Sequence, residues 1–138
     1  MDRDKLWPAL LASLGAFWLS LEASYQLLLM LQGIDILTGL IAGRHTTDGV
    51  KSDVMWAGIR KKALSWLLVL LAAIVGSYVV STTGSALPAL IGPAAALAFC
   101  GVEVVSVLEN AERGGVDAGV IGRIRSAIAT VLKAPPKE

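Results

Sequence analysis

The chain lacks most of the side chains with which soluble enzymes do chemistry. It has one cysteine, Cys100, and one histidine, His45. A single cysteine excludes an internal disulfide and a thiolate metal cluster. The histidine lies in a polar stretch and forms no Ser–His–Asp or Cys/His pattern, and no glycine-rich phosphate loop is present. We therefore expect no catalytic residue, no cofactor site and no metal site, and a function other than that of an enzyme.

Charged residues are also scarce, while apolar residues are abundant. The 138 residues are 17% charged and 55% hydrophobic, with a mean hydropathy of +0.68. Soluble domains average about 25% charged and about 45–50% apolar residues. A soluble domain of this size could not bury so much apolar surface. The composition therefore predicts one integral membrane domain over residues 1–138.

Long apolar stretches predict the fold class, an all-α integral membrane protein with four transmembrane helices arranged as two hairpins. The predicted spans are residues 6–21, 25–43, 63–80 and 87–108. The first stretch rises only about 24 Å, which is short for a hydrocarbon core of about 30 Å. A signal peptide would be as short, but residues 21–24 lack a small-x-small cleavage pattern, so a first span is predicted. Pro88 and Pro93 predict an irregular start to the fourth span.

The basic residues predict how these spans are oriented. All Lys and Arg residues lie at the N-terminus, in residues 44–62, or after Leu108, and none lies in the turns at 22–24 and 81–86. Because basic loops stay in the cytoplasm, this pattern predicts that both termini and the 44–62 loop are cytoplasmic. The residues expected to set this topology are Arg44, Lys51, Arg60, Lys61 and Lys62. Topology and anionic lipid explain this basic loop better than nucleic acid, and we expect no nucleic-acid partner.

The cytoplasmic tail, residues 109–138, contains a predicted basic amphipathic helix. Asp117 can cap a helix that continues to about Lys133. Its apolar side chains recur on one stripe, formed by Val120, Ile121, Ile124, Ile128, Val131 and Leu132. Arg123, Arg125 and Lys133 project elsewhere. Such a helix either lies in the lipid headgroups or packs on a protein partner, and the sequence leaves both open.

Acidic residues inside the predicted spans are the best candidates for a functional site. A carboxylate at the bilayer centre costs roughly 2.5–3.5 kcal/mol, so it must contact protein or water. Asp35 lies near the middle of the second span and Glu103 lies near the inner end of the fourth, at similar depths. They could hold helices together through each other or through nearby hydroxyls, or they could line a water path or an oligomer interface. The candidates are Asp35, Thr38, Gly39, Glu103, Ser106, Glu109 and Asn110.

Two of these segments together resemble a known family. The first is Ile34–Gly39 (IDILTG), followed by Ala42, Ser52, Gly58 and Arg60-Lys61 before another apolar run. The second is Glu103–Asn110 (EVVSVLEN), followed by Gly114-Gly115. In this order they are similar to the toxin-secretion/phage-lysis holin family, over about residues 25–125.

The resemblance implies a bacteriophage holin. Such proteins accumulate in the inner membrane of the bacterial host, form homo-oligomers and open lesions at a set time. An endolysin then escapes and the host cell lyses. The implied partners are the lipid bilayer, further copies of the chain, the endolysin and in some cases an antiholin.

Two other functions remain open from the residues alone. A small multi-span proton-coupled transporter would also have this length and an intramembrane carboxylate. An antiholin or a structural membrane subunit would have the same composition.

Overall fold

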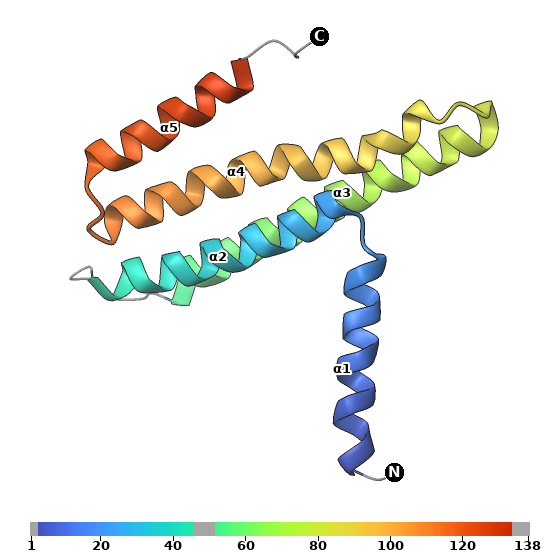
Figure 1. The fold of residues 1–138 in the computed structure, drawn as a ribbon, viewed down its shortest axis with the longest axis horizontal. Helices are drawn as coiled ribbons and strands as arrows, with labels where there is room; N and C mark the ends of the chain where they lie inside the picture. Colours follow the sequence, from blue (N-terminus) through green and yellow to red (C-terminus); the bar gives the residue numbers. More distant parts are fainter. Residues whose placement is uncertain (1–2, 46–51, 134–138) are drawn as a thin grey trace.

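The computed structural model describes residues 3–45 and 52–133, and these form helices joined by short turns (Figure 1). The elements are α1 (Arg3–Ser20), α2 (Ala23–His45), α3 (Ser52–Thr83), the 3-10 helix η1 (Leu87–Leu90), α4 (Ile91–Arg113) and α5 (Ala118–Lys133). No strand occurs among the described residues. The all-helical fold class is therefore confirmed.

Three of the described helical segments are long and apolar enough to cross a membrane. They are Ala23–His45, Ser52–Thr83 and Leu87–Arg113. The apolar part of α1, Leu11–Ser20, is shorter than these segments. Three candidate spans are thus present, and the first predicted span stays a prediction.

The helix α4 packs along both α2 and α3 (Figure 1). The core at this junction consists of Leu28 from α2, Val69 from α3, and Ala96 and Cys100 from α4. The direct links between α2 and α3 include the hydrogen bonds of Gln32 to Ser65 and Trp66 and a ring contact between Tyr25 and Trp66. By contrast, α1 projects away from the other helices, and α5 turns back alongside α4.

Two glycines allow the helices to approach closely at the end where α2 begins and α3 ends. A Cβ on Gly76 would lie 2.3 Å from the carbonyl oxygen of Pro88, and a Cβ on Gly92 would lie 3.0 Å from the Cα of Ala73. Neither backbone position leaves room for a side chain. Small residues at such crossings are typical of helix packing in lipid, where close van der Waals contact drives association. Pro88 also lies in η1, the irregular turn that its presence predicted.

The predicted 44–62 loop differs from the structure. Arg44 belongs to the last turn of α2, and Ser52 to Lys62 form the first turns of α3. With 32 residues, α3 is about 48 Å long, which exceeds the hydrocarbon core of about 30 Å. The difference arises because charged residues such as Arg60 and Lys61 are good helix formers and continue the helix out of the apolar region.

Candidate functional site: a buried ion network between three helices

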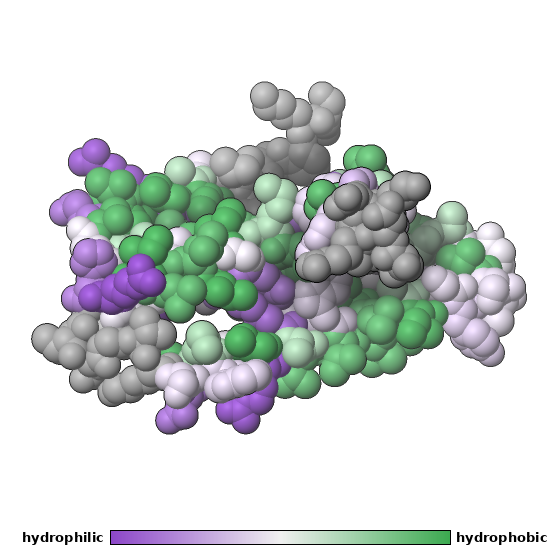
Figure 2. All heavy atoms as spheres, turned by 90° about the horizontal axis from the view of Figure 1, so that it is seen from below, coloured by the Kyte–Doolittle hydropathy of each residue, from purple (hydrophilic) through white to green (hydrophobic). Residues whose placement is uncertain are grey.

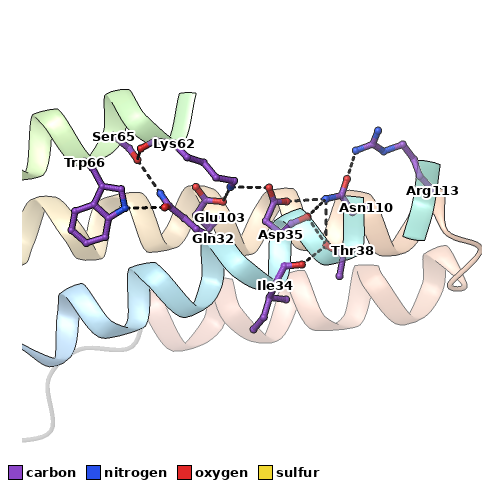
Figure 3. A network of polar contacts seen from close by, with 10 residues as sticks. All are labelled: Gln32, Ile34, Asp35, Thr38, Lys62, Ser65, Trp66, Glu103, Asn110 and Arg113. Atoms are coloured by element: carbon purple, nitrogen blue, oxygen red, sulfur yellow. Dashed lines mark hydrogen bonds and ion pairs between the residues drawn. The ribbon is translucent and has the colours of Figure 1, made fainter. Parts of the chain in front are cut away.

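Polar side chains from α2, α3 and α4 meet in the space between these helices (Figure 3). On α2 they are Gln32, Asp35 and Thr38, spaced three residues apart, so they share one face of the helix. On α3 they are Lys62, Ser65 and Trp66, and on α4 they are Glu103, Asn110 and Arg113. Each set recurs at helical spacing, which is why three otherwise apolar helices can present a continuous polar seam to one another.

The centre of the seam is an ion triad formed by Asp35, Lys62 and Glu103. The Lys62 Nζ atom lies 2.9 Å from Asp35 Oδ2 and 2.5 Å from Glu103 Oε2. The three side chains are 16%, 13% and 9% exposed, respectively. The two carboxylates, predicted to lie at similar depths, are thus joined through one ammonium group.

Asn110 extends the network towards the end of α4. Its Nδ2 donates to Asp35 Oδ1 at 2.8 Å and to the Asp35 backbone oxygen at 3.2 Å, and it lies 3.4 Å from Thr38 Oγ1. Its Oδ1 accepts a hydrogen bond from the Arg113 guanidinium. A Cβ on Gly39 would lie 3.3 Å from Asn110 Nδ2, so the missing side chain at position 39 leaves room for the amide.

On the other side of the triad, Gln32 connects α2 to α3. Its Nε2 donates to Ser65 Oγ at 3.0 Å, and its Oε1 accepts from Trp66 Nε1 at 2.9 Å. Ser65 Oγ in turn donates to the backbone oxygen of Lys62 at 2.7 Å. The amide of Gln32 is therefore satisfied at both ends, as a buried polar group in an apolar region requires.

The electrostatics of the triad favour its staying together. Two carboxylates and one ammonium leave one uncompensated negative charge, and the dipole of the Asn110 amide points a donor at it. Separating any one charge inside an apolar medium would cost several kcal/mol. In lipid this cost forces the three side chains either to remain in contact or to face water.

A cavity of about 730 Å³ opens beside the triad between α2, α3 and α4. We call it the polar recess. Its lining includes Asp35, Gly39, Lys62, Glu103, Ser106 and Asn110, together with apolar residues such as Phe99 and Val102. In Figure 2, hydrophilic residues are visible between strongly apolar surfaces on the face from which α1 projects. The recess therefore places charged side chains beside an open space between the three helices.

The structure brings most of the predicted site residues together. Asp35, Thr38, Gly39, Glu103, Ser106 and Asn110 all belong to the network or line the recess. Glu109 is exposed and takes no part. Of the predicted topology residues, Arg44, Arg60 and Lys61 are exposed, and Lys51 lies outside the described residues.

Sequence reasoning missed the role of Lys62, which it grouped with the other basic residues. It also missed Gln32, Ser65 and Trp66 as partners. The available signal was spacing, because Lys62 and Ser65 are three residues apart and directly adjoin the apolar run of α3. Which helix they would face could not be read from the chain.

No curated protein and no solved structure is similar enough to the chain to be matched. The bacteriophage holin family, in contrast, matches residues 12–132, which is most of the chain. This is a family of membrane pore-forming proteins and not of enzymes. The three apolar helices agree with it, and together they identify an integral membrane protein. The chain belongs to the bacteriophage holin family.

Proposed function

We propose that the protein is a holin that oligomerises in the inner membrane of the bacterial host and opens lesions through which an endolysin reaches the cell wall. The observation that carries this proposal is the ion triad, which is buried within helices long enough to span a bilayer yet borders an open recess. A helix that only anchors a protein in lipid has no need of three charged side chains at this depth.

The triad can be stable in two different surroundings. In a closed chain, Asp35 and Glu103 share the ammonium group of Lys62, and Asp35 also accepts a hydrogen bond from Asn110, so the polar groups of the seam are satisfied within the bundle. In an open oligomer, the same side chains can face water, where separated charges cost little. A transition between these two states replaces internal ion pairs by hydration, and this exchange is the step that we assign to lesion opening. Thr38, Gly39, Ser106 and Asn110 line or support the same seam and are candidates for the wetted surface, whereas Glu109 is a candidate only for contacts outside it.

We further propose that both termini and residues 44–62 face the cytoplasm, with α1 as a fourth span. The two-residue connection between α1 and α2 favours antiparallel neighbours. Cysteine labelling from outside the cell tests this topology. A probe at position 51 should stay unmodified, and its modification would overturn the orientation.

Inducible expression in bacteria, with and without a co-expressed endolysin, tests the function itself. We expect abrupt clearing of the culture only when both proteins are present. Expression of the chain alone should produce sudden depolarisation and arrest of growth. Continued growth and a normal membrane potential at high protein level would instead identify an antiholin or a structural subunit.

A small proton-coupled transporter is the second candidate, and the size of the recess favours it. Small-molecule sites usually enclose about 300–1,000 Å³, and the recess falls within this range. A transporter would give resistance to toxic compounds on expression without lysis. Abrupt clearing with endolysin, which a transporter does not cause, separates the two candidates.

A further inference from the structure

The helix α5 has a face that no other described helix covers. Its substantial contact is with α4 alone, and within it Ile121 is 2% exposed. Val120 and Ile124, on the neighbouring part of the same apolar stripe, are 46% and 41% exposed. The stripe is therefore covered along one edge by α4 and open along the other.

The turn before α5 reverses the direction of the chain, so that α5 runs back alongside α4. Gly114 caps the C-terminus of α4, and Gly115 has a φ of +97°, a value that favours glycine. Asp117 Oδ1 then accepts a hydrogen bond from the amide of Val120 at 3.1 Å and so starts the new helix. Since α4 belongs to a candidate span, a helix that folds back alongside it runs towards the membrane again and not into water (Figure 1).

The charges of α5 fit an anionic surface. Within Ala118–Lys133 the charged residues are Arg123, Arg125 and Lys133, and the helix contains no acidic residue. At 3.6 residues per turn, Arg123 and Arg125 fall on opposite edges of the apolar stripe. Arginines in these positions can reach lipid phosphates while the stripe between them enters the headgroup region. Arg125 is 3.8 Å from Glu112, at a half-exposed position that leaves its guanidinium open to a second partner.

The described part of α5 offers little apolar surface to a protein partner. The described part of α5 exposes two large apolar side chains. A stable protein interface needs about 20–30 residues and about 800 Å² on each side. Binding to lipid has no such minimum area, because each inserted apolar residue adds its own contribution to the binding free energy.

We propose that α5 docks on anionic phospholipid headgroups, with Val120 and Ile124 inserted and Arg123 and Arg125 bound to phosphates. This inference needs the membrane spans but not the lysis activity proposed above. It can therefore fail or succeed independently of that activity.

An environment-sensitive fluorophore on the full-length protein tests the inference. The probe is attached at Ile124→Cys in a Cys100→Ala background, and the protein is reconstituted in vesicles of phosphatidylcholine alone or of equimolar phosphatidylcholine and phosphatidylglycerol. In the anionic vesicles we expect a blue-shifted emission, quenching by spin-labelled lipid and protection from iodide. The matched control is a probe at Ser126→Cys, on the opposite face of the same helix, which should remain accessible to iodide.

Substitution of the two arginines tests the electrostatic contribution to membrane binding. Each cation near an anionic surface changes the inserted-to-exposed ratio about fivefold, so Arg123→Gln with Arg125→Gln should lower it about 25-fold. Arg123→Lys with Arg125→Lys keeps both positive charges and should leave the ratio close to that of the parent. Raised salt should weaken insertion in the anionic vesicles.

Three results would overturn the inference. The first is a water-exposed probe at position 124 in the anionic vesicles. The second is equal shielding in both kinds of vesicle with no effect of the arginine substitutions, which would mean that the stripe packs on protein within the chain. The third is shielding that appears only at a high ratio of protein to lipid, which would identify a second copy as the occupant.

Discussion

At the scale of single residues, Lys62 is the centre of the network. Its ammonium group bonds to carboxylates from two other helices, so it fixes α3 against both α2 and α4. The neighbouring Arg60 and Lys61 are exposed, which shows how a difference of one or two positions on a helix separates a structural cation from a solvated one.

Replacing Lys62 should destabilise the fold strongly. Lys62→Met leaves two buried carboxylates without a counter-ion, and removing one partner of a buried ion pair typically costs about 3–5 kcal/mol. Titration with a denaturing detergent, followed by circular dichroism, measures the free energy of unfolding. Arg60→Met is the matched control and should change it little. Adding Asp35→Asn and Glu103→Gln to Lys62→Met should restore much of the loss. Equal stability of Lys62→Met and Arg60→Met would refute the role of the triad.

Asn110 and Glu109 are adjacent in sequence but differ in environment, which gives a second prediction. Asn110→Leu removes the hydrogen bonds to Asp35 and Thr38, and an unsatisfied buried polar group costs about 1–3 kcal/mol. Glu109→Leu changes an exposed side chain and should have a smaller effect on the same unfolding measurement. A larger effect at Glu109 would contradict the observed arrangement.

A substitution of Asp35 should also change the time at which the culture lyses. At equal protein level, Asp35→Asn should advance clearing of the culture in the presence of endolysin, because the closed chain loses one of the ion pairs that hold its helices together. Lys137→Ala, a change in the C-terminal tail, is the control and should leave the timing close to that of the parent. Culture density after induction records both. Unchanged timing for Asp35→Asn would remove the triad from the mechanism of opening.

At the scale of elements, glycines with opposite surroundings should respond oppositely to one added methyl group. In Gly76→Ala the new Cβ would lie 2.3 Å from a backbone oxygen, and overpacking of this kind costs about 1–3 kcal/mol. In Gly101→Ala it meets nothing within 4 Å, so the higher helix propensity of alanine should stabilise α4 by up to about 1 kcal/mol. Unfolding measurements on both variants check the sign. Destabilisation by Gly101→Ala would indicate that α4 is covered at this position.

The sequence predicted the helices well because apolar length and breaking residues are local properties. Candidate spans over residues 23–45, 52–83 and 87–113 enclose the predicted segments 25–43, 63–80 and 87–108. The ends differed where charged helix formers continued a helix beyond its apolar part, as in the first turns of α3. The apolar part of α1 is too short for its length to identify a membrane span. Its prediction as a span therefore depends on the flanking sequence alone.

The candidate site was predictable on α2 and α4 but not on α3. Carboxylates within an apolar run are conspicuous, so Asp35 and Glu103 were identified. Lys62 was not, because a lysine at the end of a basic segment looks the same whether it faces water or folds inward over a neighbouring helix. Its partners became evident only with the packing of α4 against α2 and α3.

At the scale of the whole molecule, hydration of the polar recess distinguishes a protein-lined cavity from a lipid-facing surface. Ser106 lines the recess, whereas Val105 is 49% exposed and on a different face of α4. In a Cys100→Ala background, a membrane-impermeant thiol reagent should modify Ser106→Cys from the cytoplasmic side faster than Val105→Cys. The rate of modification is the measurement. Faster reaction at position 105 would mean that the recess is filled by lipid or protein.

The central place of α4 has a consequence for how the chain is made. The helix that joins α2 to α3 is synthesised after both, so Asp35 and Lys62 enter the bilayer before the surface that holds them in register exists. A chain truncated before Glu103 lacks the surface against which α2 and α3 pack, and membrane proteases should degrade it. Complete chains are then the form that we expect to accumulate in the membrane.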